Sequence, residues 1–399
     1  MSTPFHGRGA VSNPAHRFET LERQAVDDGW ARDEEVPAAP DTQVIEQQAR
    51  TALTRNDSPD IPFDRSVNPY QGCEHGCVYC YARPSHAYHG LSPGLDFETR
   101  IIARPNIAAR LREELSQPGY RPAPVALGAN TDPWQPVERH LGITRQVLEV
   151  LAEARHPLTL VTKSSLVERD LGLLAEMARD GLVHAAVSVC TLDAELARRL
   201  EPRAASPARR LKALERLAGA GIPCAVLAAP VIPGLTDRDL EKVLEAAHDA
   251  GARSAGYVLL RLPHELKQVF RDWLEAHHPL AAGHVMSLLR QMREGRENSP
   301  AFGLRQRGTG VFADLLAQRF RVARRRLGLD AGLPPLELAR FRPPGRGGAA
   351  APFLGRIPVD RRGWRSCPHA ARSAWRRRLR GGYPGACCYT REPIRSGGG

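Results

Sequence analysis

Between about residue 64 and residue 262, short apolar runs alternate with segments of helical pattern. This alternation predicts parallel strands joined by right-handed helical crossovers. Each helix carries the chain back to the end of the sheet at which the previous strand began, so the next strand runs in the same direction. We expect strands at Ser66–Tyr70, Val125–Asn130, Leu158–Ser164, His184–Thr191, Pro223–Pro230 and Ser254–Leu262. The intervening helices are expected near residues 105–117, 142–155, 166–181, 206–220 and 237–251.

The number of repeats decides which fold is expected. Six βα units fall short of the eight that close a TIM barrel, so the predicted fold class is α/β, a partial (β/α)6 TIM-like barrel with a helical C-terminal extension. The helical pattern continues over residues 264–328 and is interrupted at Gly308-Thr-Gly310. The predicted domains are an irregular N-terminal extension at 1–60 (with one helix expected in Asp41–Arg55), the core partial barrel at 61–300, a helical C-terminal segment at 301–345 and a low-complexity Arg/Gly-rich tail at 346–399.

Basic residues are concentrated at one end of the chain. The formal net charge is +12, and residues 301–399 hold 21 arginines and five acidic residues, whereas the rest of the chain holds 35 basic and 39 acidic residues. Such a segment can bind nucleic acid through its phosphates, but a solvated tail explains the same composition. We expect no membrane segment and no apolar signal core, and the cysteine usage suits a reducing cytoplasm.

Three of the eight cysteines lie close together, at Cys73, Cys77 and Cys80. Gly72 and Gly76 disfavour a helix here and favour a loop around a compact metal centre. Three thiolates can hold three corners of a [4Fe–4S] cluster and leave the fourth iron open for chemistry. A zinc site would need a fourth ligand, and three reduced thiols without metal are a third interpretation. The histidines near enough in sequence to complete a zinc site are His75, His86 and His89.

The residues around the cysteines resemble a known superfamily. The spacing Cys-x3-Cys-x2-Cys with Tyr79 before the last cysteine, within the longer run from Asn68 to His86, is similar to the radical S-adenosylmethionine superfamily and to its branch that includes spore photoproduct lyase. The resemblance covers roughly residues 60–345. It implies that the thiolates hold the cluster, that S-adenosylmethionine chelates the open iron, and that one-electron reduction yields a 5′-deoxyadenosyl radical.

Polar residues follow the predicted strands at the ends where parallel α/β folds bind ligands. Asn130, Thr131 and Asp132 follow one strand, Lys163 ends the next, and Ser188 lies within the one after that. A lysine at this place offers a point charge for a carboxylate, although turn chemistry and a surface lysine are the alternatives. The resemblance implies that S-adenosylmethionine is bound by Tyr79, Asn130, Thr131, Asp132, Lys163, Ser188 and Arg203.

Three further residues are candidates for catalysis. Strand alternation places Cys190 on the same face as Ser188, where a thiol could donate a hydrogen atom to a radical, although a single buried cysteine is more often a small apolar residue. Tyr81 and His86 lie just after the cysteines and either face a substrate or pack around the cluster. For Arg203 the alternative is an ion pair with a glutamate such as Glu201.

The sequence thus favours a radical enzyme of unknown substrate, which binds a [4Fe–4S] cluster and S-adenosylmethionine and receives electrons from a donor such as flavodoxin or ferredoxin. By analogy with spore photoproduct lyase, nucleic acid is one expected substrate class, and this step depends on the resemblance alone. The alternative is a zinc-stabilised nucleic-acid-binding protein, with zinc at the cysteines and the arginines on phosphates.

Overall fold

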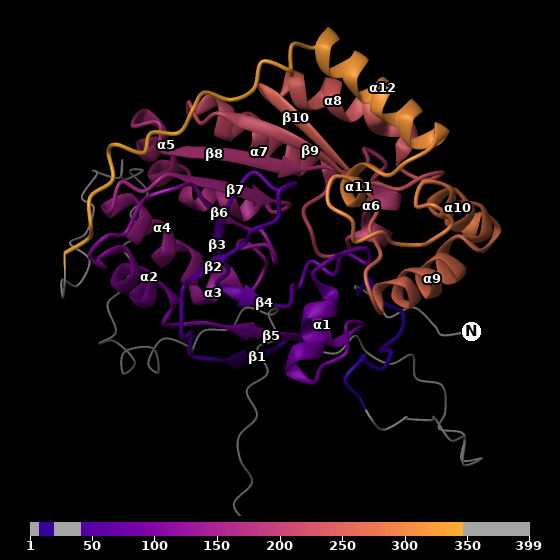
Figure 1. Cartoon of the computed structure of the whole chain (residues 1–399), viewed down its shortest axis with the longest axis horizontal. Coiled ribbons are helices and arrows are strands. Elements are labelled where there is room, and N and C mark those ends of the chain that lie inside the picture. The colour runs from indigo at the N-terminus through magenta and orange to yellow at the C-terminus, as the bar shows by residue number, and fades with distance from the viewer. Residues whose placement is uncertain (1–7, 20–40, 346–399) are drawn as a thin grey trace, which may run out of the picture. The chain divides into compact units, whose positions relative to one another are not determined.

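The computed structural model describes residues 8–19 and 41–345. The Arg/Gly-rich tail predicted at 346–399 and most of the extension predicted at 1–60 lie outside the described residues. The described residues form mixed α/β structure with a buried core that runs through the larger of two sheets (Figure 1).

The larger sheet has seven strands in the order β10-β9-β8-β7-β6-β3-β2. Six of them run parallel, and only β2 is antiparallel to its neighbour β3. The sheet does not close, because β10 and β2 form its two edges, so the predicted partial barrel with six parallel strands is confirmed. The strands are β2 (Leu53–Arg55), β3 (Arg65–Val67), β6 (Val125–Leu127), β7 (Leu158–Thr162), β8 (Val183–Ser188), β9 (Cys224–Val231) and β10 (Ser254–Leu259).

Each crossover carries a helix whose apolar side packs on the sheet. In α7, for example, Ser206 caps the first turn, Pro207 occupies a position where no N–H is needed, and Leu214 and Leu217 are buried. The main crossover helices are α2 (Ile107–Leu115), α4 (Ile143–Glu153), α5 (Leu171–Arg179), α7 (Pro207–Gly219) and α8 (Leu240–Asp249). Shorter elements are η1 (Arg83–His89), α1 (Asp96–Thr99), α3 (Glu138–Leu141), η2 (Ser165–Asp170), α6 (Ala194–Leu200) and η3 (Asp237–Asp239).

The predicted strands began close to the right residues, and all but the one expected at Pro223–Pro230, which ends at Val231, extended too far. The strand expected at Val125–Asn130 ends at Leu127, because Gly128 turns the chain with a φ of 91°. The same glycine lies against the next strand, since an added Cβ would be 2.3 Å from the carbonyl oxygen of Val161. The polar residues after Gly128 therefore belong to a loop at the strand end.

Within the described part of the chain, four helices follow the last strand: α9 (Leu266–His277), α10 (Pro279–Gln291), α11 (Leu304–Arg307) and α12 (Val311–Arg326). The expected interruption at Gly308 and Gly310 is confirmed, because both have positive φ angles and separate α11 from α12. Helix α12 packs beside the sheet, where the ring of Phe320 lies tilted at 48° against that of Tyr257 of β10, with ring centroids 4.6 Å apart. Arg319 also forms a bidentate ion pair with Glu241 of α8.

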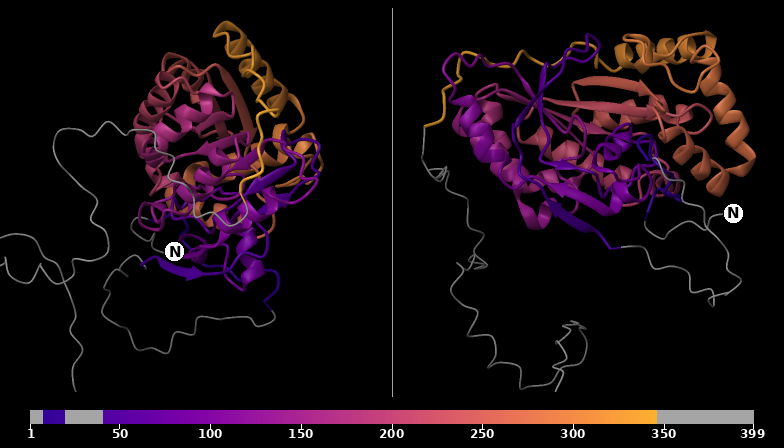
Figure 2. Two further views of the ribbon diagram at one scale, coloured as in Figure 1. Left: turned by 90° about the vertical axis from the view of Figure 1, so that its left-hand side faces the viewer. Right: turned by 60° about the horizontal axis from the view of Figure 1, so that its bottom comes forward.

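The helix expected within Asp41–Arg55 is wrong. This segment instead contains β2 and the strand β1 (Gln43–Glu46), which pairs in parallel with β5 (Arg100–Ala103). Together with β4 (Tyr70–Gln71) these form a three-stranded sheet next to α1, at the side of the described structure opposite α12 (Figures 1 and 2). Pairing with residues more than 50 positions away overrides the local helical preference.

A polar clamp joins the two edges of the open sheet. Asp60, in the loop between β2 and β3, forms an ion pair with Arg305 of α11 and accepts a hydrogen bond of 3.1 Å from the backbone N–H of Gly303. The side chain of Gln306 donates to the Asp60 carbonyl. Residues that follow the last strand therefore hold the loop beside the first strands.

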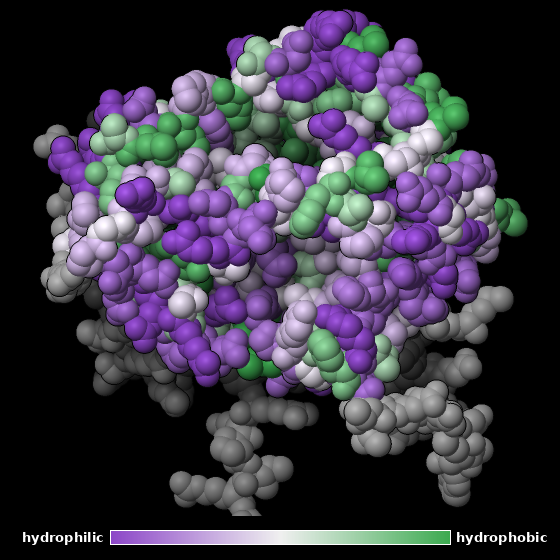
Figure 3. Space-filling view, viewed as in Figure 1, coloured by the Kyte–Doolittle hydropathy of each residue, from purple (hydrophilic) through white to green (hydrophobic). Residues whose placement is uncertain are grey.

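The face shown in Figure 3 is mainly hydrophilic, with hydrophobic residues in small groups. Among the described residues, no helix combines the length and apolar character that crossing a membrane requires.

Candidate functional site

The loop that carries the three cysteines is buried and kept in shape by glycines. Cys73 and Cys77 are almost inaccessible, Cys80 is partly exposed, and none of the three forms a disulfide. Gly72 and Gly76 have φ angles of 78° and 67°, which other residues rarely adopt. A Cβ at Gly76 would also lie 2.7 Å from a carboxylate oxygen of a neighbouring glutamate. The glycines therefore allow three thiols to gather on one tight loop.

The three thiols influence one another. Burial raises the pKa of Cys73, and the nearby charges of Asp132 and Cys80 raise it further. Burial likewise raises the pKa of Cys77, while the ammonium of Lys163 opposes this shift. Thiols in such a place remain protonated unless a cation compensates them, and a coordinating metal deprotonates a thiol outright. The donor set thus fits a group that brings positive charge.

Two buried charged residues hold the loop backbone. Arg83 donates from Nε to the carbonyl of Cys77 at 2.9 Å and from Nη2 to the carbonyl of Gly76 at 3.1 Å. The same guanidinium donates to the carbonyl of Gly94 at 2.8 Å. Glu98 forms an ion pair with Arg83 at 2.5 Å, and both side chains are fully buried. The main chain between two of the cysteines is therefore fixed by a desolvated charge pair.

The surroundings of the loop retain unused polar atoms. Buried oxygens of Gln71 and Glu74 and the Nδ1 atom of His86 have no hydrogen-bond partner among the residues that the structure describes. Across residues 8–19 and 41–345, no three His, Cys, Asp or Glu side chains converge closely enough to hold a single metal ion. Tetrahedral zinc would require sulfurs roughly 4 Å apart. A cubane cluster takes three thiolates on separate corners and leaves its fourth iron open, so the chemistry of a three-cysteine donor set fits it.

Asp132 ties the cysteine loop to the end of β7. Its carboxylate accepts hydrogen bonds from the backbone N–H of Lys163 at 2.7 Å and from the Thr162 hydroxyl at 2.8 Å. It also lies 3.4 Å from Nδ1 of His75, although burial lowers the pKa of that imidazole to about 4 and keeps it neutral near pH 7. The carboxylate of Asp132 is thus engaged in holding the chain.

The two residues that precede Asp132 differ in whether their side chains have hydrogen-bond partners. The hydroxyl of Thr131 is buried and donates to the carbonyl of Tyr70 at 2.8 Å. The side chain of Asn130 is only partly buried and has no hydrogen-bond partner within the described part of the chain. Of the three residues in this strand-end motif, Asn130 is therefore the one whose polar atoms remain available to a ligand.

Tyr79 lies at the centre of a buried network. Its hydroxyl donates to Glu201, whose other carboxylate oxygen is paired with Arg210. The Lys163 ammonium lies 5.8 Å from the centre of the Tyr79 ring, within the range of a cation–π contact. Residues from the cysteine loop, the end of β7 and the segment after α6 therefore meet at one tyrosine.

The predicted residues of β8 join the same network. Arg210 donates to the carbonyl of Ser188 at 3.0 Å, and the Ser188 hydroxyl donates to the carbonyl of Ala229 at 3.1 Å. The Sγ atom of Cys190 lies 3.9 Å from the Tyr79 hydroxyl, and burial raises the pKa of this thiol. Cys190 is therefore a protonated thiol beside the cysteine loop.

Arg203 contacts the cysteine loop from the other side. Its guanidinium pairs with Glu74 at 3.1 Å, and its backbone N–H donates to the carbonyl of His75 at 3.2 Å. The ion pair with Glu201 considered from the sequence is not formed, because Glu201 is paired with Arg210. One third of the Arg203 side chain remains exposed, so part of its charge is accessible.

Tyr81 and His86 have different surroundings. Tyr81 is about half exposed, and its hydroxyl donates to the carbonyl of Ala129 at the end of β6. His86 is fully buried, with Nε2 3.0 Å from the carbonyl of Arg100 and its ring edge-on to Phe97. Only Tyr81 is positioned to meet a molecule that enters from solvent.

Arg261 is a site residue that the sequence reasoning missed. It follows β10, its guanidinium lies 5.8 Å from the Tyr81 ring centre, and its buried Nε atom has no partner in the described ranges 8–19 and 41–345. Arg293 supports this place by donating to the adjacent carbonyl of Leu260 at 2.9 Å. Looking for polar residues after every apolar strand, applied to Leu259-Leu260-Arg261, could have found it.

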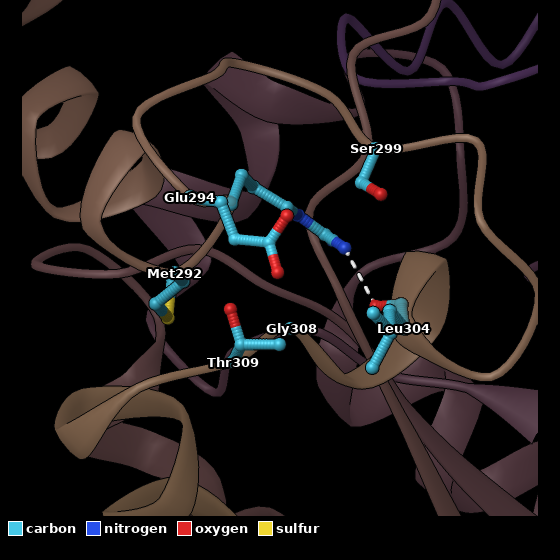
Figure 4. A pocket seen from close by; sticks show the side chains of 7 residues that line it. Met292, Glu294, Ser299, Leu304, Gly308 and Thr309 are labelled. Atoms are coloured by element: carbon cyan, nitrogen blue, oxygen red, sulfur yellow. Dashed lines mark hydrogen bonds between the residues drawn. The ribbon is translucent and has the colours of Figure 1, made fainter.

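Arg293 also closes the turn after α10. It donates to the carbonyl of Leu304, as the dashed line in Figure 4 shows, and to the carbonyl of Arg305. Met292, Gly308 and Thr309 line the small hollow around it, together with Glu294 and Ser299. This hollow lies within the C-terminal segment and contains none of the predicted site residues.

Comparison with known proteins agrees with the geometry. The sequence profile described as the radical SAM superfamily matches residues 67–247. A protein of Mycobacterium tuberculosis (strain ATCC 25618 / H37Rv) described as uncharacterized is 39% identical over 233 residues, which is 58% of this chain and 68% of that protein. Another uncharacterized protein, from Methanocaldococcus jannaschii, is 23% identical over 195 residues, which is 49% of this chain and 70% of its own length.

Among solved structures, a spore photoproduct lyase variant with bound AdoMet and dinucleoside spore photoproduct has a TM-score of 0.53 at 16% identity, over 71% of this chain and 79% of that one. A second variant gives 0.52 at 17% identity, over 72% and 80% of the two chains. At this identity the likeness shows the fold alone. Taken with the profile match and the mycobacterial relative, the cysteine loop and the open sheet identify this chain as a member of the radical SAM superfamily, with a fold similar to that of spore photoproduct lyase.

Proposed function

We propose that this protein is a radical SAM enzyme that holds a [4Fe–4S] cluster on Cys73, Cys77 and Cys80 and cleaves S-adenosylmethionine reductively. The observation that carries the proposal is the buried loop with three free thiols, whose main chain is fixed by Arg83 and Glu98. The three thiolates would hold the cluster, and the chemistry it would supply is the one-electron reduction of the sulfonium of S-adenosylmethionine.

The protein's own residues orient the cofactor. Lys163, beside the Tyr79 ring, supplies a positive charge for the methionyl carboxylate, and the side chain of Asn130 is available to hydrogen-bond it. Asp132 and Ser188 shape the pocket by fixing the backbone at the ends of β7 and β9. Cys190, kept protonated by burial near Tyr79, is a candidate hydrogen-atom donor.

The substrate enters beside Tyr81. This ring is half exposed beside the end of β6, and Arg261 lies against it with a buried nitrogen that no described residue contacts through a hydrogen bond. An aromatic face next to a guanidinium suits a flat heterocycle that carries a negative charge, so a damaged nucleic acid is the substrate class to test first. The reaction also requires a one-electron donor such as flavodoxin or ferredoxin, and we place it in a reducing cytoplasm.

The test is anaerobic reconstitution of the protein with iron and sulfide, followed by dithionite and S-adenosylmethionine. We expect a brown protein with broad visible absorbance and release of 5′-deoxyadenosine, measured by chromatography. Cys77→Ala should lose both the colour and the product. Cys224→Ala is the matched control, because Cys224 is equally buried but lies at the start of β9, and it should retain both.

The same assay separates the alternatives. Stoichiometric zinc without iron, and no deoxyadenosine, would contradict the enzyme and favour a zinc-stabilised nucleic-acid-binding protein. Running the reaction with undamaged and ultraviolet-damaged DNA tests the substrate class, since a substrate increases deoxyadenosine formation. Equal product with both DNAs and without DNA would remove nucleic acid from the proposal and leave the radical SAM activity in place.

A further inference from the structure

Residues 8–19, which we call the N-terminal strap, lie against the cysteine loop although they are more than 50 residues away in sequence. The backbone N–H groups of Gly9 and Ala10 donate to the two carboxylate oxygens of Glu98 at 2.9 and 2.8 Å. Arg8 donates to the backbone carbonyl of the same glutamate at 3.1 Å. Glu98 thus binds the strap while also pairing with Arg83, which holds the loop carbonyls.

The contact between strap and loop leaves no room for a side chain. A Cβ at Gly9 would lie 1.9 Å from the carbonyl oxygen of Gly76, between Cys73 and Cys77 in sequence. On the loop side of the strap, a Cβ at Gly94 would lie 2.3 Å from the carbonyl oxygen of Ser12. Neither Gly9 nor Gly94 has a positive φ, so both are glycines because of close backbone approach.

The strap continues to a second anchor on α9. The hydroxyl of Ser12 donates to Asp272 at 2.6 Å, and Arg17 forms a bidentate contact of 3.1 Å with Glu265, just before α9. Between these anchors, Asn13 exchanges two hydrogen bonds of 3.1 Å with Asp96. The strap therefore connects the cysteine loop to α9 by specific polar contacts along its length.

We propose that the N-terminal strap is a wall of the iron–sulfur site, which closes the cysteine loop from solvent and limits access of oxidants and chelators to the cluster. Ala10 is fully buried in the same apolar cluster as Cys77, as expected for a covering segment. The proposal assigns a role to residues outside the region matched by the superfamily profile, and its link to the cluster depends on the function proposed above.

The test measures thiol accessibility in the metal-free full-length protein. Gly9→Ala and Gly94→Ala each push the strap away from the loop, one from each side of the contact. We expect the labelling rates of Cys73, Cys77 and Cys80 by a maleimide, followed by mass spectrometry of peptides, to rise at least about tenfold in both variants, because local opening becomes easier. Gly172→Ala, where an added Cβ meets nothing within 4 Å, is the matched control and should leave the rates unchanged.

Cys224 reports global unfolding in the same experiment, since it is 1% exposed at the start of β9, whereas the strap is anchored on Glu98, Asp272 and Glu265. If Cys224 becomes reactive together with the loop cysteines, the double variant Ser12→Ala/Arg17→Ala decides, because it releases the α9 anchor without inserting a methyl group. Hydrogen exchange of residues 8–19 shows whether the strap is released in a variant. If the strap is released and the loop cysteines still react at the wild-type rate, the proposal is overturned.

The reconstituted protein supplies an independent readout. In Gly9→Ala and Gly94→Ala, the visible absorbance of the cluster should bleach at least about tenfold faster in the presence of a chelator than in Gly172→Ala. Faster thiol labelling without any cluster would support the strap and reject the proposed function. The opposite result is a stable cluster and normal deoxyadenosine release, with labelling and bleaching rates unchanged in the variants. It would support the proposed function and reject the role of the strap.

Discussion

The strands β7 to β9 and the cysteine loop are both buried, but different forces hold them. In β7 the side chains alternate between buried and partly buried, and Leu158 and Leu160 contribute to the continuous apolar core. Around the cysteine loop the fully buried side chains include Arg83 and Glu98, which hold backbone groups. Apolar burial is tolerant of small changes in position, whereas buried charges demand nearly complete pairing. The loop is therefore the less forgiving region.

The largest expected effect comes from Arg83→Ala. Removing this guanidinium leaves the buried Glu98 without its positively charged partner and frees the carbonyls of Gly76 and Cys77. We expect the free energy of unfolding to fall by about 3–5 kcal/mol, as measured by urea denaturation of the metal-free protein. Labelling of the loop cysteines in native buffer should increase well before global unfolding.

Leu160→Ala is the control for that prediction in the other region. Leu160 is 1% exposed in β7, and its truncation should cost about 2–5 kcal/mol through a cavity. A similar loss of stability without selective labelling of the loop cysteines would sharpen the difference between the two regions. Equal labelling in both variants would show that the loop opens only with the whole fold.

A smaller effect is expected from the buried His156, which lies just before β7. Its Nδ1–H donates to the carbonyl of Pro157 at 2.9 Å, Nε2 accepts from the Tyr120 hydroxyl, and burial lowers its pKa to about 4. Since the unfolded imidazole has a pKa near 6.5, the unfolded state binds the proton first, and stability falls as the pH drops from about 6.5 toward 4. Between pH 7 and pH 5 this residue should account for about 2 kcal/mol.

The measurement is urea denaturation at pH 7, 6 and 5 for the wild type and for His156→Gln. The variant should lose less stability than the wild type over this range. Parallel curves for the two proteins would show that His156 does not titrate on unfolding, and that the acid sensitivity arises at the other buried histidines, His75 and His86.

The smallest expected effect tests the network that joins the two regions. Tyr79→Phe removes the hydrogen bond to Glu201 but leaves the ion pair of Glu201 with Arg210, so it should cost about 1.5–2 kcal/mol in urea denaturation. Tyr81→Phe is the matched control, since this half-exposed tyrosine bonds a single carbonyl and should cost less than about 1 kcal/mol. Equal costs for the two variants would mean that burial does not strengthen the Tyr79 contact.

The same contrast explains how much could be predicted. The repeat of apolar strands and helices gave the open α/β sheet, because β6 to β10 are built from local periodicity and each pairs with a neighbour along the chain. The spacing of the three cysteines predicted them as metal ligands, and the structure places them together on one buried loop. The pairing of β1 with β5 was missed. The four residues of β1 carry no local pattern that indicates a partner strand more than 50 positions away.

The residues that support the site were harder to predict for the same reason. Glu98, Arg83 and Arg210 act on backbone groups or charges brought near by the fold, and nothing in their own sequence neighbourhood distinguishes them from surface residues. Arg203 was expected near the cofactor, but its ion pair with Glu74 could be seen only once the chain after α6 was placed against the cysteine loop. Long-range polar contacts leave no periodic signal in a sequence.

The clamp formed by Asp60 with Gly303 and Arg305 affects how the molecule reaches its native state. These contacts join positions that are 243 and 245 residues apart, so neither edge of the sheet can be locked until almost all of the described chain has been synthesised. Contacts of such long range slow folding, because the loop must close before the interaction is gained. A nascent chain that ends before Gly303 would expose both edges, β2 and β10, to other molecules. Production of the protein should therefore benefit from slow translation or chaperones more than from a higher intrinsic stability of the sheet.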